Sequence, residues 1–144
     1  MQIAALDRKA WGSAKEVIFI PDGEHAWRLW VEYALVYACL TDEEKVIGAG
    51  LAFPSLSEEH GKLLAVHKLF VDPEYRGKGI GTALFEKLTA FADAHEYRCF
   101  LSVKPTNESA ISVYKKLGFI KDKEIKGYYR PYEDRLIMVR SPSQ

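Results

Sequence analysis

The chain has little net charge, little cysteine and no long apolar run, and each shortage excludes a class of function. Lysine and arginine together number 20 and are balanced by 20 acidic residues, whereas proteins that follow a phosphate backbone usually carry a clear basic excess. We therefore expect no nucleic-acid partner. The longest apolar run, residues 34–40, is far shorter than the ~20 residues of a membrane-spanning helix, so we expect no membrane partner either.

The two cysteines, Cys39 and Cys99, are far apart and form no C-x-x-C pair. Both stand in apolar surroundings, which favours two buried reduced thiols over a disulfide, and we expect no metal site. The first ten residues contain no apolar core of the length that a secretory signal needs. These features together predict a cytoplasmic location.

The length and composition are those of an ordinary globular domain. The chain has 144 residues, of which 48% are hydrophobic and 28% charged. No repeat, low-complexity tract or linker interrupts it, so we expect one domain over residues 1–144, as a monomer or a homodimer.

Apolar patterning predicts a mixed sheet with helices on its faces. Strands are expected over residues 15–20, 34–40, 46–53, 63–71, 100–103, 126–132 and 135–139. Helical segments are expected over residues 24–32, 79–91 and 109–117. Residues 54–62 are polar and expected to form a loop, and Gly118 is expected to end the last helix, where a positive φ is tolerated.

The most informative segment joins the strand expected at 63–71 to the helix that follows it. Its glycines and cations are Arg76, Gly77, Lys78, Gly79 and Gly81. Glycine lets a backbone approach a ligand closely, and a helix N-terminus favours negative charge, so the segment suits a phosphate or diphosphate. Its spacing fits neither the P-loop nor the G-x-G-x-x-G dinucleotide motif. A turn that only packs the helix onto the sheet is the alternative at this point.

Two motifs in this chain resemble those of the GNAT superfamily of N-acetyltransferases. Residues 76–81, Arg-Gly-Lys-Gly-Ile-Gly, are similar to the family's R/Q-x-x-G-x-G/A, and the strand ending before them, residues 69–73, matches as well. Residues 107–119 resemble its second motif, N-x-x-A-x-x-x-Y-x-x-x-G-F. The resemblance covers residues 34–140. The two motifs occur in the family's order and at its usual separation, which favours membership of the family over coincidence.

The resemblance implies an α/β (α+β) fold: a mixed, mostly antiparallel central sheet, flanked by helices, whose fourth and fifth strands splay apart. It implies an acetyl-CoA-dependent N-acetyltransferase that transfers an acetyl group directly to a primary amine within a ternary complex. The pantetheine arm of acetyl-CoA would lie between the splayed strands and its diphosphate on the glycine turn. The cofactor-binding residues so implied are Leu69, Phe70, Val71, Arg76, Gly77, Lys78, Gly79, Ile80, Gly81, Thr82, Asn107 and Tyr114.

Single residues acquire roles from the same resemblance. Tyr114 matches the tyrosine that protonates the leaving sulfur, although periodicity alone would make it a packing aromatic. Asn107 matches a contact of the pantetheine arm and also suits a helix N-cap. A backbone N–H near Phe70 or Val71 would meet the oxyanion. His67 is the expected base, because imidazole titrates near neutrality; the alternative is a histidine with no proton role.

The acceptor is expected to be a protein N-terminal α-amine or a small-molecule amine. Residues 127–138 resemble the ending of the protein N-terminal acetyltransferase branch, which includes enzymes of ribosomal proteins; Tyr128 and Tyr129 would then line the acceptor entrance. An edge hairpin with aromatic pairs is the alternative. Glu58, in the loop before the 63–71 strand, would bind a cationic acceptor. The rival function is a non-catalytic acyl-CoA-binding or sensing module, against which Tyr114 and the second motif argue.

Overall fold

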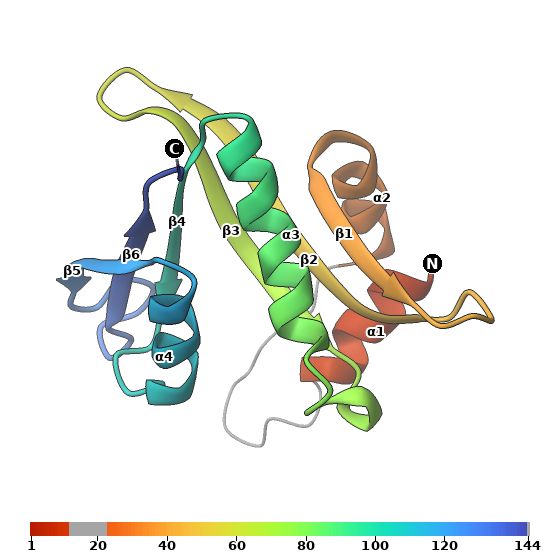
Figure 1. Ribbon diagram of the computed structural model, residues 1–144. Coiled ribbons are helices and arrows are strands. Elements are labelled where there is room, and N and C mark those ends of the chain that lie inside the picture. Colours follow the sequence, from red (N-terminus) through yellow and green to blue (C-terminus); the bar gives the residue numbers. More distant parts are fainter. Residues whose placement is uncertain (12–22, 144) are drawn as a thin grey trace. The chain divides into compact units, whose positions relative to one another are not determined.

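The computed structural model describes residues 1–11 and 23–143, so the strand expected over residues 15–20 lies outside the described residues. The elements follow one another in a mixed order of helices and strands (Figure 1). They are α1 (Gln2–Trp11), α2 (Glu24–Tyr33), β1 (Leu35–Leu40), β2 (Val46–Ser57), β3 (Gly61–Val71), the 3₁₀ turn η1 (Pro73–Tyr75), α3 (Ile80–Ala94), β4 (Arg98–Val103), α4 (Glu108–Lys116), β5 (Ile120–Ile125) and β6 (Arg135–Arg140).

The six strands form one mixed sheet in the order β1-β2-β3-β4-β6-β5. Strand β1 pairs antiparallel with β2, and β6 pairs antiparallel with both β4 and β5. Strands β3 and β4, which are the fourth and fifth of the expected series, are parallel and pair over Leu63–Ala65 and Arg98–Phe100. Both strands run on beyond this short pairing, to Val71 and Val103. The expected mixed, mostly antiparallel sheet is confirmed.

The chain divides into two compact units. The first, here called the turn unit, comprises Met1–Phe53 with His67–Leu88 and contains the glycine turn. The second, here called the tyrosine unit, comprises Pro54–Val66 with Thr89–Gln144 and contains Tyr114. None of the helices in the described ranges is long and apolar enough to cross a membrane.

In the turn unit, the two faces of β2 carry different helices. The buried Ala49 and Leu51 belong to a core cluster with α1, α2 and the buried Phe70 of β3. The alternate residues Gly48 and Gly50 face α3, as the two-residue period of a strand requires. A Cβ at Gly48 would lie 3.1 Å from side-chain atoms of both Ile80 and Leu84. The small residues of β2 therefore let α3 pack close to the sheet, which fixes where α3 begins.

Helix α1 was not predicted, and the reason is a charge in its buried face. Its core residues are Ile3, Ala4, Leu6 and Ala10, which follow helical spacing. Asp7 interrupts that face and is fully buried. The Asp7 carboxylate accepts hydrogen bonds from Trp27 Nε1 and Lys68 Nζ, both at 3.0 Å. Neither partner is near Asp7 in the sequence. The apolar pattern of the helix is therefore interrupted by an acidic residue whose burial the sequence does not explain.

The core of the tyrosine unit follows strand alternation. Cys99, Leu101 and Val103 of β4 are buried, while the residues between them are less so, as expected for a strand with one face on a core. Phe119 and Met138 are buried as well. Burial raises the pKa of the Cys99 thiol to about 11. Cys39, expected to be buried, is only half-buried because it lies on β1, at the edge of the sheet.

Two predicted boundaries are wrong. Residues 54–62 are not a loop, because β2 continues to Ser57 and β3 begins at Gly61, with only residues 58–60 in the turn. Residues 126–132 are not a strand; the last hairpin uses β5, Ile120–Ile125, instead. Both errors have one cause. These strand segments are largely exposed, so burial does not impose the apolar alternation from which strands are recognised.

Candidate functional site

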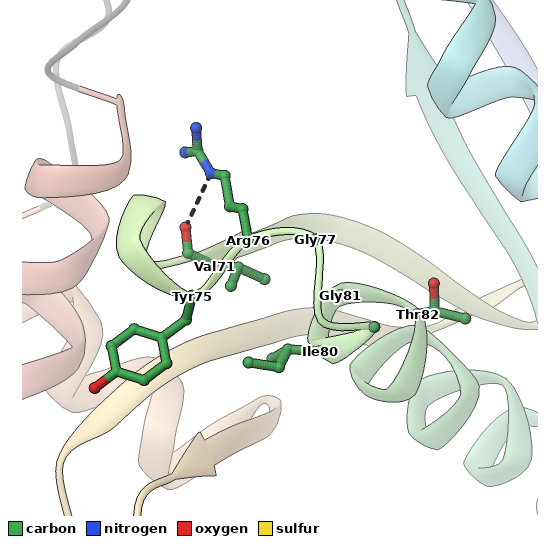
Figure 2. Close-up of a pocket in the computed structure, with 8 residues that line it drawn as sticks. Val71, Tyr75, Arg76, Gly77, Ile80, Gly81 and Thr82 are labelled. Carbon is green, nitrogen blue, oxygen red and sulfur yellow. Dashed lines mark hydrogen bonds between the residues drawn. The ribbon is translucent and has the colours of Figure 1, made fainter.

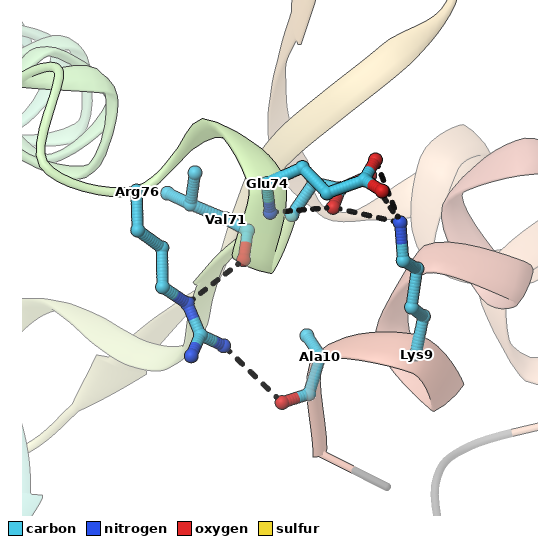
Figure 3. A network of polar contacts seen from close by, with 6 residues as sticks. Lys9, Ala10, Val71, Glu74 and Arg76 are labelled. Atoms are coloured by element: carbon cyan, nitrogen blue, oxygen red, sulfur yellow. Dashed lines mark hydrogen bonds and ion pairs between the residues drawn. The ribbon is translucent and has the colours of Figure 1, made fainter. Parts of the chain in front are cut away.

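The glycine turn begins at Asp72, a buried carboxylate that ends β3. Its backbone N–H donates to Ile47 O at 2.8 Å, and its side chain caps η1 by accepting the Glu74 N–H at 3.1 Å. Lys9 Nζ of α1 donates to both carboxylate oxygens, at 2.8 and 3.0 Å, and to Glu74 Oε2 at 3.3 Å (Figure 3). The hydrogen bond from Lys9 holds the pKa of Asp72 below its usual range. Helix α1 is thereby fastened to the start of the turn.

The turn itself requires glycine at two positions. Gly77 and Gly79 have φ of +76° and +79°, and a Cβ at either would meet no atom within 4 Å. The requirement is therefore conformational, since side-chain-bearing residues avoid this left-handed region. Gly81 has no such φ, and a Cβ there would make only ordinary contacts with Leu69 and Val71, at 3.5 and 3.7 Å. The sequence motif requires glycine at residue 79 and allows alanine at residue 81, which agrees with the difference between these two positions.

The turn opens onto a hollow of about 280 Å³ at the N-terminus of α3 (Figure 2). Its lining residues are Val71, Tyr75, Arg76, Gly77, Gly79, Ile80, Gly81 and Thr82. The first N–H groups of a helix lack partners within the helix and carry partial positive charge. Lys78 Nζ and Lys45 Nζ lie 5.1 and 5.3 Å from the ring centre of Tyr75. Backbone donors and Arg76 thus line a space that suits a diphosphate, and two lysines lie close to one of its lining residues, Tyr75.

Arg76 connects this hollow with a second one of about 260 Å³, lined by Ala10, Leu69, Phe70, Val71 and Arg76. Its Nε donates to Val71 O at 3.4 Å and its Nη2 to Ala10 O at 3.3 Å. Both are long hydrogen bonds from an exposed side chain, so they yield readily to an anion. The structure therefore brings Leu69, Phe70 and Val71 together with the residues of the turn.

His67 lies on β3 in the same unit but lines neither hollow. Its ring stands 5.9 Å from the ring of Trp30 and 5.5 Å from that of Phe53, centre to centre. The imidazole is thus flanked by aromatic side chains of α2 and β2. The expected role as a base stays a prediction.

Tyr114 lies on α4, in the tyrosine unit. Burial raises the pKa of its hydroxyl, so the phenol keeps its proton throughout the neutral range. The helix begins at Asn107, whose Oδ1 accepts the Ala110 N–H at 3.2 Å and the Ser109 hydroxyl at 3.2 Å. Asn107 is therefore the N-cap of α4, as its residue type suggested. Its expected contact with the pantetheine arm is compatible with this cap and stays a prediction.

The residues proposed to line the acceptor entrance occupy the loop between β5 and β6. Tyr128 and Tyr129 are exposed, with ring centres 4.7 Å apart in an edge-to-face arrangement. Tyr129 is held by Ser102, whose hydroxyl lies 3.3 Å from its own, and by Arg135, which stands 5.0 Å over its ring. Because β5 is the edge strand and pairs antiparallel with β6, this loop belongs to an edge hairpin, as the alternative had it. The role of the two tyrosines at an acceptor entrance stays a prediction. Glu58 lies in the turn between β2 and β3, in the tyrosine unit, where it is exposed. Its expected role toward a cationic acceptor stays a prediction.

Sequence reasoning missed the side chains that hold the turn from outside it. Lys9 and Ala10 contact Asp72 and Arg76 across more than 60 positions of the sequence. The Asp-Pro pair at residues 72–73 was a readable signal for a cap, since aspartate favours N-caps and proline the first helical position. Nothing local to Lys9 marks it as the partner.

Comparison with known proteins identifies the family. The model of the acetyltransferase (GNAT) family matches residues 2–119. Over 73 residues the chain is 41% identical to an uncharacterised N-acetyltransferase of Methanocaldococcus jannaschii, covering 50% of this chain and 32% of the relative. It is 42% identical over 69 residues to an N-alpha-acetyltransferase of Saccharolobus solfataricus, covering 46% and 41%. It is 34% identical over 85 residues to the thialysine N-epsilon-acetyltransferase of Bos taurus, covering 58% and 50%.

The matched segments thus span between a third and a half of these relatives. Among solved structures, the ribosomal-protein-S18-alanine N-acetyltransferase of Escherichia coli has a TM-score of 0.75 at 22% identity, covering 99% of this chain and 87% of that one. The NatC complex bound to Gag peptide and CoA has a TM-score of 0.80 at 19% identity, covering 99% and 91%. At these identities the likeness is one of fold. Because the family model matches well over half of its length, the chain belongs to the acetyltransferase (GNAT) family.

Proposed function

We propose that the chain is an acetyl-CoA-dependent N-acetyltransferase that transfers the acetyl group directly to a primary amine. The observation that carries this proposal is the turn at residues 76–82. Two glycines in the left-handed region, the N-terminus of α3 and the side chain of Arg76 surround one hollow. The relatives named above are N-acetyltransferases, and one solved neighbour carries CoA, which supports acetyl-CoA as the donor.

In this proposal the turn binds the diphosphate of acetyl-CoA. The N–H groups of the turn and of the first turn of α3 donate to its oxygens. Arg76 exchanges its long bonds to Val71 O and Ala10 O for the anion, which is a stronger acceptor than a neutral carbonyl. Leu69, Phe70 and Val71 of β3 continue from the turn along the pantetheine arm. A backbone N–H of Phe70 or Val71 meets the oxyanion that forms when the amine attacks.

Tyr114 supplies the proton that the reaction needs at sulfur. The amine nitrogen bonds to the thioester carbon, the carbon–sulfur bond breaks, and the sulfur takes the phenolic proton. The ammonium nitrogen loses a proton, to His67 or to water, and the tyrosinate regains one from solvent. A hydroxyl whose pKa is raised by burial is protonated before transfer, as a general acid must be.

For the acceptor, we propose a protein N-terminal α-amine. The exposed tyrosine pair at 128–129 offers aromatic surface beside which an extended peptide can pack. The relative from Saccharolobus solfataricus is named an N-alpha-acetyltransferase. A side-chain or small-molecule amine is the second candidate, favoured by the match to the thialysine N-epsilon-acetyltransferase. The cytoplasmic location and the monomeric or homodimeric state stay predictions.

An acceptor panel tests both parts of the proposal. Release of CoA from acetyl-CoA would be followed with short peptides of varied first residue, the same peptides with blocked N-termini, thialysine and polyamines. We expect turnover on free N-termini and none on blocked ones, with a pH profile that changes in His67→Ala if that residue is the base. Turnover confined to thialysine or polyamines would contradict the peptide acceptor and favour a side-chain or small-molecule amine. Tight CoA binding without turnover on any amine would contradict the enzyme and favour a binding module.

A further inference from the structure

The C-terminal end of α4 closes back on Tyr114. The N–H of Phe119 donates to Tyr114 O at 3.0 Å, and the N–H of Gly118 to Lys115 O at 3.1 Å. Gly118 has φ +90°, so the end is a Schellman motif with glycine at its left-handed position. The hydrophobic contact that accompanies this motif joins the same two residues, since the rings of Phe119 and Tyr114 lie 6.1 Å apart. The backbone and the ring of Tyr114 are therefore both held by the residues that end its helix.

The end of the helix is in turn held by Arg140 of β6. Arg140 Nε donates to Leu117 O at 2.8 Å, and Leu117 is the C-cap residue of α4. Carbonyls at a helix end lack partners within the helix. The Arg140 side chain also lies against Gly118, where a Cβ would come within 3.4 Å of its Nε. One arginine thus supports the carbonyl before Gly118 and fills the space over Gly118 itself.

Arg140 is fixed by a carboxylate from a third place in the chain. Its Nη1 and Nη2 donate to the two oxygens of Asp93, at 2.7 and 2.8 Å, a bidentate pair. Asp93 Oδ1 also accepts the Ser143 N–H at 2.7 Å. The Arg140 side chain is 10% exposed. Because all three guanidinium nitrogens donate hydrogen bonds and the side chain is largely buried, the conformation of Arg140 is fixed. The segment that it contacts, residues 117–118, is restrained in turn.

We propose that Arg140, oriented by Asp93, is a positioning residue for Tyr114. It fixes residues 117–119, which fix the backbone and ring of Tyr114 and hence the direction in which the hydroxyl points. The inference rests on the proposed role of Tyr114 as the acid, and it adds two residues that neither family motif contains. Every contact in the argument lies within the tyrosine unit, so losing Arg140 should slow proton transfer without weakening diphosphate binding at the turn.

A double-mutant comparison tests this. Two quantities would be measured: kcat at saturating acetyl-CoA and the Kd for CoA. The proteins compared are wild type, Arg140→Met, Tyr114→Phe and the double variant. Small misplacements of catalytic groups cost up to about 100-fold in rate, so we expect Arg140→Met to lower kcat about 10-fold or more with Kd within about twofold. The double variant should be no slower than Tyr114→Phe alone, because residues that act as a unit are not additive. Losses that multiply, or a Kd that rises with the loss of kcat, would overturn the proposal.

Three further variants keep the test decisive. Arg140→Lys retains a cation but not the bidentate fork, and it should fall between wild type and Arg140→Met; it carries the test if the methionine variant does not fold. Asp93→Asn should lower kcat in the same sense. Arg28→Met is the matched control, since Arg28 also pairs with a carboxylate, Glu24, but on the exposed surface of α2; it should change neither constant.

Amide hydrogen exchange separates this proposal from the proposed function. In Arg140→Met the N–H groups of Gly118 and Phe119 should exchange about 10-fold faster or more, while those of β1 and β2 keep their wild-type rates. Unchanged exchange at Gly118 and Phe119 would overturn the proposal whatever the activity. If Tyr114→Phe keeps the wild-type kcat, the positioning role falls while the transferase function stands. If the wild type acetylates no amine, the positioning role of Arg140 in catalysis is contradicted together with the proposed function, even where exchange shows that it holds α4.

Discussion

The glycine turn and the end of α4 are built in the same way but differ in solvent exposure. Each has glycine in the left-handed region, at Gly77 and Gly79 in one case and at Gly118 in the other. Each is held by a carboxylate–cation pair between residues far apart in the sequence. In the turn unit the cation, Lys9, has a half-exposed side chain (47%), whereas in the tyrosine unit the cation, Arg140, is 10% exposed.

Under the proposed function, this difference in exposure corresponds to a difference in role. A diphosphate bound at the turn would have to enter and leave, and cations there that face solvent could rearrange around it. A proton donor acts only from one direction, and a bidentate arginine that is largely buried holds its helix more rigidly than a flexible lysine can. Substitutions in each unit test whether the two sites differ in this way.

The largest effect is expected from Tyr114→Phe, which removes the proposed acid and leaves the packing of the ring. General acid catalysis contributes about 10²- to 10⁴-fold, so kcat should fall by at least about 100-fold. The Kd for CoA, measured by calorimetry, should stay within about twofold, because the turn lies in the other unit. A proportional loss of CoA affinity would show that the two units do not divide the work in this way.

The next effect compares the two carboxylates. Asp93→Asn leaves a largely buried guanidinium without its anion, and breaking such pairs costs about 3 kcal/mol or more when both groups are fully buried. Because Asp93 keeps 27% of its side-chain surface exposed, we expect about 2 kcal/mol in denaturant unfolding. Asp72→Asn should cost less, since Lys9 is left in solvent and an amide oxygen still accepts the Glu74 N–H. Equal losses would contradict the contrast in exposure.

The third pair of variants probes the turn alone. Gly79→Ala forces a side chain into the left-handed region, at about 1 kcal/mol, and should weaken CoA binding about fivefold through distortion of the turn. Gly81→Ala meets only ordinary contacts and should bind CoA with nearly wild-type affinity. Calorimetric titration of CoA into both variants checks this. Equal weakening would mean that close approach of the ligand, rather than backbone conformation, requires the glycines.

The smallest effect is a dependence of stability on acid. The hydrogen bond from Lys9 to Asp72, and that from Arg140 to Asp93, hold the pKa of each carboxyl below the unfolded value of 3.8. The stabilisation from each is complete above that value and is lost as the pH falls through the lower, folded pKa. Unfolding free energy measured by denaturant should therefore be flat near neutrality and decline below about pH 4. Asp93→Asn should flatten that decline; an unchanged slope would contradict the assignment.

Features of the fold and the site that depend on residues close together in the sequence could be predicted, whereas those that depend on distant residues could not. The turn was predicted nearly to the residue, because Gly77 and Gly79 determine the backbone conformation locally. The start of α4 was likewise predicted from Asn107, whose residue type favours an N-cap. Helix α1 was missed because Asp7 stands in its buried face, where its partners Trp27 and Lys68 are supplied by other elements. Strand β5 was misplaced because its side chains are solvated and its composition is consequently charged.

The same distinction explains what was missed at the site. Tyr114 was found through a motif, but Arg140 and Asp93, 47 positions apart, carry no local sign that they meet. Their partnership exists only after β6 and the end of α3 are in place. A pair of this kind is visible to sequence reasoning only through comparison of many related chains.

Binding of a diphosphate at the turn is tested by comparing two ligands. Calorimetric titration of CoA and of pantetheine, which lacks the diphosphate and the nucleotide, would give both affinities under one salt condition. We expect CoA to bind at one site at least about 100-fold more tightly than pantetheine, since charge-assisted hydrogen bonds contribute about 1.5–3 kcal/mol each. Equal affinities, or no binding of CoA, would contradict it.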